Sequence, residues 1–263
     1  MADEQWGAAM RLLWGPEPAA KPARGPKRGL TLEAIARTGI GIADAEGLGA
    51  VSMQRVAGEL GVTKMALYRY VPGKAELVAL MVEGALPVPA VPVAVSVEGG
   101  WREQLEVWAR ELYAGFRRHP WLLEATVGVR VMGPRELGWM ERALSALDGC
   151  GLSGAEAMDA VVLVAGHVRG IAEQERAAGG AGPDAQLAVV LGEVMKVRGA
   201  DFPALGAALA SVAEHGGQDG ALEFGLDRIL DGLGLLVARR AGGGSWFKRL
   251  IRLSRELGGG GGA

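Results

Sequence analysis

Apolar side chains recur every three to four residues along most of this chain, which is the period of an amphipathic α-helix. The first clear run follows Thr31, a residue type that caps helices, and continues to about Glu46, where two glycines interrupt it. Alternation of apolar and polar residues, which is typical of a β-strand, is rare. The pattern therefore predicts an all-α fold, and the apolar positions of this first helix are Leu32, Ile35, Ala36, Ile40 and Ala43.

Three shorter helices are predicted directly after this one. Ser52 is placed to cap a helix over residues 53–60, Thr63 caps one of about two turns, and Lys74 opens another. Glycine or proline separates each helix from the next. We interpret residues 29–86 as one compact helical domain.

The rest of the chain divides into an N-terminal extension, a longer helical domain and a tail. Residues 1–28 begin with a short apolar segment and end in an arm rich in proline, lysine and arginine. Three prolines make residues 87–98 an extended connector. We expect residues 99–240 to form the second domain and residues 241–263 to form a flexible glycine-rich tail. The tail contains a short basic amphipathic stretch, so contact with a membrane surface is the alternative. The helices expected after the connector lie at about 101–118, 121–131, 134–148, 153–176, 184–199, 203–214 and 220–240.

Composition narrows the class of protein. With 263 residues, 49% of them apolar, the chain is long enough for one large or two small domains with a core. Its single cysteine, Cys150, excludes an internal disulfide and a cysteine cluster for zinc. No apolar stretch is long enough to span a membrane, and the N-terminus lacks the pattern of a secretory signal. We therefore expect a cytoplasmic protein without a membrane partner.

Charge is distributed unevenly along the chain. Residues 21–74 carry nine basic and four acidic side chains, a net charge of +5, although the whole chain has a net charge of −2. The remaining residues therefore sum to −7. A basic segment on an acidic body is suited to a protein that meets phosphate groups with one part only.

Residues 51–74 carry the most informative pattern. Ala57 and Gly61 have the spacing of a helix-turn-helix, in which a small residue lies where two short helices cross and a glycine forms the turn. Apolar residues at positions 56, 60, 62 and 67 supply the contact between the two helices. The second helix projects donors and apolar tips suited to base edges and phosphates, at Thr63, Lys64, Met65, Tyr68, Arg69 and Tyr70.

This segment resembles the DNA-binding domain of the TetR family of bacterial repressors. The resemblance rests on the motifs ADAEGLGAVSM (43–53), VAGELGV (56–62) and LYRYVPGKAEL (67–77), of which the last is the most specific. Residues 99–119, 160–175 and 221–233 are similar to the C-terminal domain of the tetracycline-repressor subgroup. The resemblance covers about residues 24–240 and implies an N-terminal three-helix helix-turn-helix domain followed by a helical ligand-binding and dimerisation domain.

The resemblance implies DNA-binding roles for matching positions. Thr63, Lys64 and Met65 would face base edges, with Met53 and Gln54 near the groove. Met53 stands where one family member has an arginine that reads DNA. The resemblance therefore implies no particular operator sequence. Phosphate contacts would come from Ser52, Tyr68, Tyr70 and Lys74, while Arg24, Lys27 and Arg28 would enter the adjacent minor groove as an arm or else form a solvated tail.

The resemblance also implies a homodimer and a sensor domain. Residues 157–173 and 221–237 would pack against the same helices of a second chain as a four-helix bundle. Two symmetric motifs would then read a palindrome in double-stranded DNA, in major grooves one turn (~34 Å) apart. A small-molecule effector would bind between the helices of residues 101–176, and its candidate lining is Trp101, Trp108, Phe116, Trp121, Val129, Met132, Trp139, Met140, Met158 and His167.

For any one of these residues the simpler interpretation is a place in the core. His167, within an apolar helix, is expected to be a satisfied core or interface histidine. Val129 takes the place of the histidine with which the tetracycline repressor binds drug-chelated magnesium, so we expect neither a metal nor a cofactor. The sequence does not identify the effector.

Together these features predict a ligand-responsive transcriptional repressor that binds a palindromic operator as a homodimer and is released by a small molecule. The alternatives are a transcriptional activator and a non-specific DNA-binding protein of the same fold. The second is disfavoured because the acidic body would repel DNA. An enzyme is not expected, because the chain has three histidines, one cysteine and no HExxH, GxSxG or phosphate-loop pattern.

Overall fold

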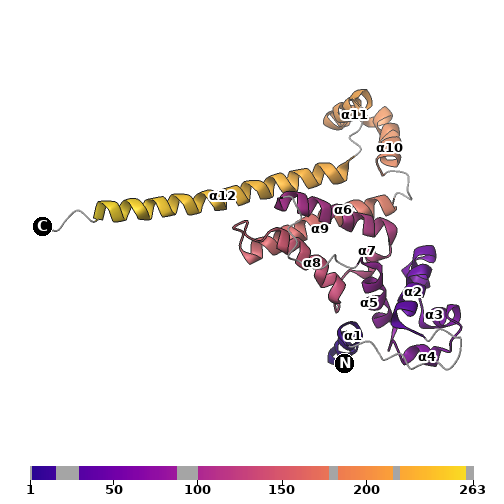
Figure 1. Cartoon of the computed structure of the whole chain (residues 1–263). Helices are drawn as coiled ribbons and strands as arrows, with labels where there is room; N and C mark the ends of the chain where they lie inside the picture. The colour runs from indigo at the N-terminus through magenta and orange to yellow at the C-terminus, as the bar shows by residue number, and fades with distance from the viewer. Residues whose placement is uncertain (1, 16–29, 88–99, 178–182, 216–219, 259–263) are drawn as a thin grey trace. The chain divides into compact units, whose positions relative to one another are not determined.

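The computed structural model describes residues 2–15, 30–87, 100–177, 183–215 and 220–258 (Figure 1). Within these ranges the chain forms α-helices and two short 3-10 helices and contains no β-strand, which confirms the predicted all-α class. The contacts divide the chain into two compact units, residues 1–100 with 110–146 and residues 101–109 with 147–263. The division differs from the boundary predicted near residue 99, because residues 110–146 group with the helix-turn-helix.

The first unit is built around helices α2 (Leu32–Glu46), α3 (Met53–Glu59), α4 (Lys64–Tyr68) and α5 (Lys74–Ala85). The predicted caps are confirmed. The hydroxyl oxygens of Thr31, Ser52 and Thr63 each accept a hydrogen bond from the backbone N–H three residues later, at 3.1, 3.1 and 3.2 Å. A 3-10 helix, η1 (Leu48–Ala50), joins α2 to α3. Because each cap depends only on neighbouring residues, the start of these three helices is predictable from the sequence.

The core of these helices lies where α2 packs against α5. Gly39 on α2 permits this close approach, because a Cβ atom there would lie 2.7 Å from the sulfur of Met81 on α5. Burying large apolar side chains provides most of the stability of such a bundle. The largest fully buried side chains here are Ile35, Val51, Val56, Leu67, Val71, Leu77, Met81 and Val82.

Three further helices belong to the first unit. Helix α1 (Ala2–Trp14) packs on α5, and the indole N–H of Trp14 donates to the carbonyl oxygen of Met132 at 3.0 Å. Helices α7 (Leu122–Ala125) and α8 (Pro134–Ala146) also contact α5. The helix expected over 121–131 is wrong in length, because the chain leaves the helix at Thr126 and Gly128 adopts a positive φ of 84°. Residues 110–118 of α6 (Trp101–Arg118) complete the unit.

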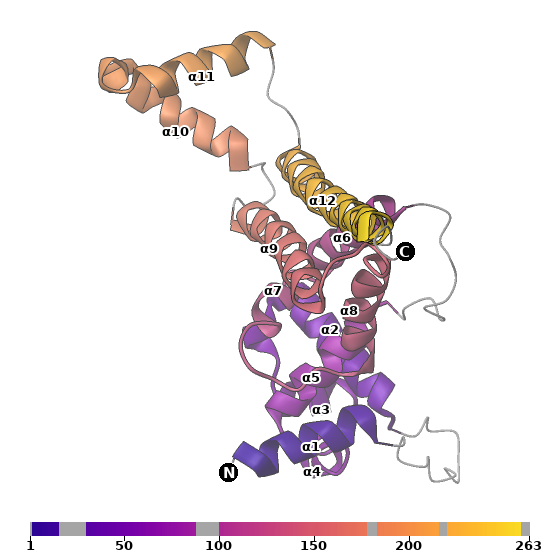
Figure 2. The ribbon, with the colours of Figure 1, turned by 90° about the vertical axis from the view of Figure 1, so that its left-hand side faces the viewer.

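The second unit contains residues 101–109 of α6 and helices α9 (Gly154–Ala177) and α12 (Ala221–Gly258), which pack against each other (Figure 2). Leu105, Val164, Leu226 and Leu230 form its fully buried centre. Helix α10 (Pro183–Arg198) and helix α11 (Pro203–His215) are joined through the 3-10 helix η2 (Gly199–Asp201).

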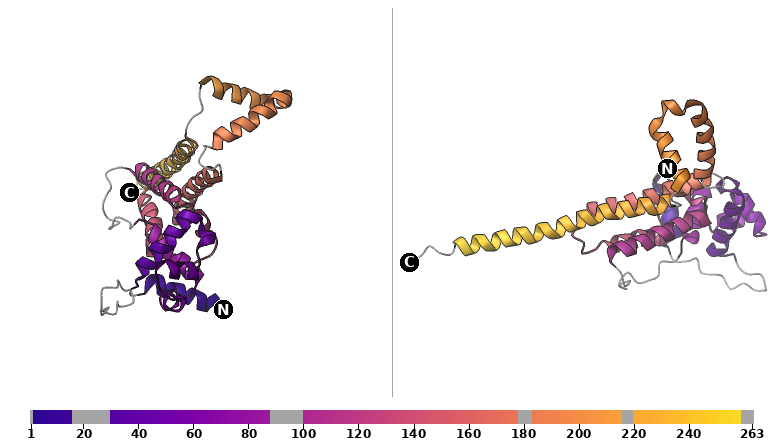
Figure 3. Two further views of the ribbon diagram at one scale, coloured as in Figure 1. Left: turned by 90° about the vertical axis from the view of Figure 1, so that its right-hand side faces the viewer. Right: turned by 90° about the horizontal axis from the view of Figure 1, so that it is seen from above.

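The C-terminal segment corrects one expectation. Residues 241–258 were expected in a flexible tail, but α12 continues through them as one helix (Figure 3). Extending an existing helix needs no new nucleus and adds one hydrogen bond per residue. The three consecutive glycines at 242–244, each costing about 1 kcal/mol relative to alanine, are therefore compatible with continuation.

The start of α9 is fixed by a reciprocal cap. The N–H of Ser153 donates to the Glu156 carboxylate at 2.8 Å, and the N–H of Glu156 donates to the Ser153 hydroxyl at 3.3 Å. Arg240 of α12 also donates to this carboxylate. The bond from the Ser153 N–H, with the Arg240 guanidinium, lowers the pKa of Glu156 to about 2.

We predict that this carboxylate stabilises the second unit in a pH-dependent way. A group whose pKa is lower in the folded than in the unfolded chain stabilises the fold above its unfolded pKa, and loses that effect as the pH falls through its folded pKa. Glu156→Gln should therefore lower the Tm at neutral pH, and the gap to the wild type should close between pH 4.5 and about 2. Thermal unfolding across this range, with exposed Glu103→Gln as control, tests it. A gap that does not change with pH would contradict the assignment.

Candidate nucleic-acid interface

The turn between α3 and α4 has the geometry of a helix-turn-helix. Gly61 adopts a φ of 64°, a left-handed conformation that glycine tolerates without strain. The N–H of Val62 then donates to the carbonyl oxygen of Ala57 at 3.0 Å, and α3 packs directly on α4. Ala57, as predicted, is buried. The two short helices are thus held as one rigid pair.

The side chains that α4 leaves in solvent combine apolar and donor groups. Met65 is 71% exposed on a helix of only five residues, while Leu67 of the same helix is fully buried. The ammonium of Lys64 lies 5.6 Å from the centre of the Tyr68 ring, which is itself exposed. The other predicted DNA-facing residues are exposed at Ser52, Gln54, Thr63, Arg69 and Lys74 and half-buried at Tyr70.

The structure does not show the remaining predicted DNA contacts on the exposed surface. Met53 is only 5% exposed, because the first residue of α3 points into the core, so its expected place near the groove is corrected. Arg24, Lys27 and Arg28 lie outside the described residues, and their role as an arm stays a prediction.

Arg55 has a structural role that the sequence did not reveal. It is exposed on α3 but pairs with Glu59 at 3.1 Å and with Glu46 at the end of α2 at 2.9 Å. These two carboxylates, with the hydrogen bond to Glu59 as the largest contribution, raise the pKa of the guanidinium. Arg55 therefore ties α3 to α2. Its charge is already balanced within the unit.

A partly buried polar cluster connects α2 to the segment after α6. The carboxylate of Asp44 on α2 accepts hydrogen bonds from Nδ1 of His119 and from the indole N–H of Trp121, both at 2.8 Å. His119 and Trp121 are both buried. The indole N–H of Trp121 thus holds the end of α2, and the place of this residue in an effector cavity stays a prediction.

A second connection joins the end of α5 to the start of α8. Both carboxylate oxygens of Glu83 accept from the first backbone N–H groups of α8, from Arg135 at 2.9 Å and from Glu136 at 3.1 Å. In return, the guanidinium of Arg135 donates to the carbonyl oxygens of Glu83 at 2.9 Å and Leu86 at 3.5 Å. Each helix end thus has its unpaired backbone groups satisfied by the other helix. We call this arrangement the α5–α8 clasp.

The residues predicted to line the effector site fall into both units. Trp101, Trp108, Met158 and His167 belong to the second unit and the other six to the first. Val129 is 89% exposed, and its place in the effector site stays a prediction. Met132 and Met158 are also exposed, Trp101 and Met140 are half-buried, and the buried members are Trp108, Phe116, Trp121 and Trp139.

His167 is a satisfied interface histidine, as predicted. Its Nε2 atom lies 2.9 Å from the carbonyl oxygen of Leu222, and because a carbonyl only accepts, this nitrogen carries the proton. Gly225 of α12 lies so close to the imidazole that a Cβ atom there would overlap the ring. The histidine therefore fixes the contact of α9 with α12.

Three further features of the described residues bear on other classes of protein. No three histidine, cysteine, aspartate or glutamate side chains among them are grouped to hold a metal ion. Burial, with a smaller effect of Asp148, raises the pKa of the Cys150 thiol, which is the opposite of the shift that activates a cysteine nucleophile. None of the described helices is long and apolar enough to cross a membrane.

The rigid α3–α4 pair and the exposed face of α4 define a helix-turn-helix DNA-binding regulator. Residues 35–81 match the family described as "Bacterial regulatory proteins, tetR family", and residues 95–237 match "Tetracyclin repressor-like, C-terminal domain". The chain belongs to the TetR family of bacterial transcriptional regulators.

Relatives and solved structures agree with this assignment. The chain is 40% identical over 242 residues to the HTH-type transcriptional repressor DrrR1 of Streptomyces coeruleorubidus, covering 89% of this chain and 87% of that protein. Its fold is similar to apo ActR from Streptomyces coelicolor, with a TM-score of 0.67, 30% identity, and coverage of 83% of this chain and 100% of that chain. ActR in complex with actinorhodin matches with a TM-score of 0.65, 30% identity, and coverage of 78% and 95%.

The clasp leads to a prediction for Gly133. A Cβ atom at this position would overlap the carboxyl group of Glu83, so the bonds from Glu83 to α8 need a glycine here. Gly133→Ala should lower the free energy of unfolding by about 1–3 kcal/mol, a typical cost of overpacking. Gly115→Ala on α6 is the control, because a Cβ atom there meets nothing within 4 Å. Urea unfolding of both variants measures the difference, and equal stability of the two would contradict the role of the clasp.

Proposed function

We propose that this protein is a homodimeric repressor that binds a palindromic operator and is released by a small-molecule effector. The observation that carries the proposal is the exposed face of α4, held against α3 by the tight turn at Gly61. The repressor DrrR1, 40% identical, supports repression as the regulatory outcome. Thr63, Lys64 and Met65 would face base edges, and Ser52, Tyr68 and Lys74 would hold phosphates.

Exposed apolar side chains on two long helices support the homodimer. Val162 and Leu163 on α9 and Phe224 and Leu235 on α12 are each more than half exposed in the single chain. These positions lie within the two stretches predicted to form a four-helix bundle with a second chain. A symmetric partner would remove this apolar surface from water and bring two copies of the helix-turn-helix into one dimer.

Release by an effector requires that a change in the sensor alters the position of the DNA-binding helices. Helix α5 begins at Lys74, immediately after the helix-turn-helix, and ends in the clasp with α8. The chain continues directly from α8 into the second unit at Leu147. We infer that effector binding shifts the population between two arrangements of α8, and that the clasp passes the shift to α5. The solved complex of ActR with actinorhodin supports a sensor of this kind.

The direct test is binding to DNA from the region upstream of the protein's own gene, with random DNA as competitor and over a salt series. Saturable binding that survives the competitor is the expected result. Tyr68→Phe should weaken binding to operator and random DNA alike by about three- to tenfold, because a lost phosphate contact carries no sequence information. Tyr113→Phe on α6 is the matched control. A loss confined to one base pair of the operator would contradict the phosphate role of Tyr68.

The dimer is tested separately. In Leu163→Glu the two-fold symmetry would place two carboxylates in the apolar interface, so the dissociation constant of the dimer should rise by about 100-fold or more. Val127→Glu, at an exposed position of the first unit, should leave it unchanged. Sedimentation velocity over a concentration series distinguishes the two. A dimer equally stable in both variants would show that α9 is not at the interface.

A further inference from the structure

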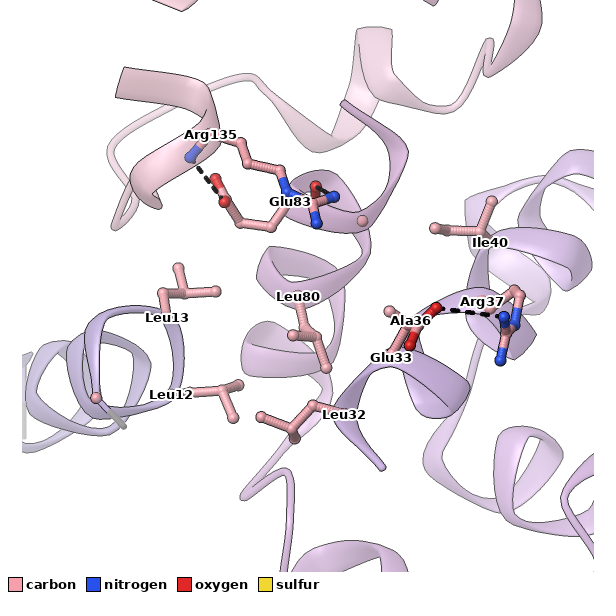
Figure 4. Close-up of a pocket in the computed structure, with 12 residues that line it drawn as sticks. Leu12, Leu13, Leu32, Glu33, Ala36, Arg37, Ile40, Leu80, Glu83 and Arg135 are labelled. Atoms are coloured by element: carbon pink, nitrogen blue, oxygen red, sulfur yellow. Dashed lines mark hydrogen bonds and ion pairs between the residues drawn. The ribbon is translucent and has the colours of Figure 1, made fainter. Parts of the chain in front are cut away.

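The first unit contains a cavity of about 390 Å³ between α1, α2, α5 and α8 (Figure 4). This volume lies within the range of small-molecule sites, roughly 300–1,000 Å³. Leu12 and Leu13 of α1 face Leu80 of α5 and Leu32 of α2 across it. Ala36 and Ile40 extend the apolar wall along α2. None of the residues predicted for the effector lines this cavity.

The charged groups of the cavity already have partners. The carboxylate of Glu83 and the guanidinium of Arg135 belong to the α5–α8 clasp and are held by backbone groups of the two helix ends. Glu33 and Arg37 form an ion pair of 3.3 Å at the solvent side. A charged ligand would lose its hydration in this cavity without gaining an unpaired counter-charge, which is unfavourable. The lining therefore favours an uncharged molecule.

One wall of the cavity comes from α1. Leu12 and Leu13 lie on α1, which precedes both segments that match the family, residues 35–81 and 95–237. Helix α1 is held in place by its packing on α5 and by the bond from Trp14 to Met132. Without α1 the apolar side chains of α2 and α5 at this place would face solvent.

We propose that this cavity is a binding site for a small, uncharged, mainly apolar molecule, separate from the effector site of the sensor. The bound molecule contacts α1, α2 and α5 at once and adds apolar contacts that hold α1 against the DNA-binding unit. It also lies against Glu83 and Arg135, the two residues of the clasp. The site does not depend on operator binding, and it is tested without DNA.

The test uses two fluorescent probes with the same ring system. N-phenyl-1-naphthylamine is uncharged, and 1-anilinonaphthalene-8-sulfonate carries one sulfonate. Titrated into the full chain, the neutral probe should bind saturably at this site. The sulfonate probe should bind about tenfold more weakly or worse, because its charge has no partner. Equal or tighter binding of the sulfonate probe would overturn the assigned ligand class.

The location is tested by filling the cavity. Leu13→Trp places a larger side chain in it from α1 and should weaken binding of the neutral probe by about tenfold or more, because the two compete for the same space. Leu144→Trp, at a half-buried position of α8 that does not line the cavity, should leave the affinity unchanged. Ile40→Phe fills the cavity from α2 and serves if α1 does not tolerate tryptophan, with circular dichroism confirming the fold. Absent binding, or binding that neither filling variant weakens, would overturn the site.

Discussion

The bonds between Glu83 and Arg135 join two helices end to end, and the DNA-binding part of the molecule depends on them. The carboxylate on α5 caps the start of α8, and the guanidinium on α8 caps the end of α5. Because each group satisfies backbone atoms that have no other helix partner, neither helix end is able to move alone without leaving buried polar groups unpaired. Helix α5 also packs on α2 and α1. The clasp therefore fixes the helix on which the rest of the first unit is assembled.

Asp44 provides a second and independent constraint. Its bonds to His119 and Trp121 hold the far end of α2, while Arg55 ties the same end to α3 through Glu46. Helices α2 and α5 are thus each attached to later parts of the chain by side chains that the helix-turn-helix motif does not contain. This explains how a five-residue helix, α4, far too short to be stable alone, presents a defined surface.

Sequence reasoning succeeded where the signal is local. Thr31, Ser52 and Thr63 cap the helices they precede, and Gly61 forms the turn, because these roles depend on the residue and its immediate neighbours. The orientation of Met53 was missed, since whether the first residue of a short helix faces groove or core depends on how that helix packs.

The features that were not predicted depend on partners far apart in the sequence. Glu83 and Arg135 are 52 residues apart, and nothing near either residue marks them as a pair. The packing of α1 on α5, which closes the cavity, likewise cannot be predicted from the sequence of either segment alone. For the aromatic residues predicted at the effector site, residue type alone does not distinguish a side chain that lines a cavity from one in the core. Trp121 and Trp139, for example, each donate a hydrogen bond from the indole N–H to another residue of the first unit.

The central claim is that two copies of α4 are presented together to DNA, and a hydroxyl-radical footprint on the operator measures this most directly. The account predicts two equivalent protected patches related by a dyad, with centres about 10 base pairs apart, at a stoichiometry of two chains per operator. A single protected patch, or uniform protection without a dyad, would contradict it.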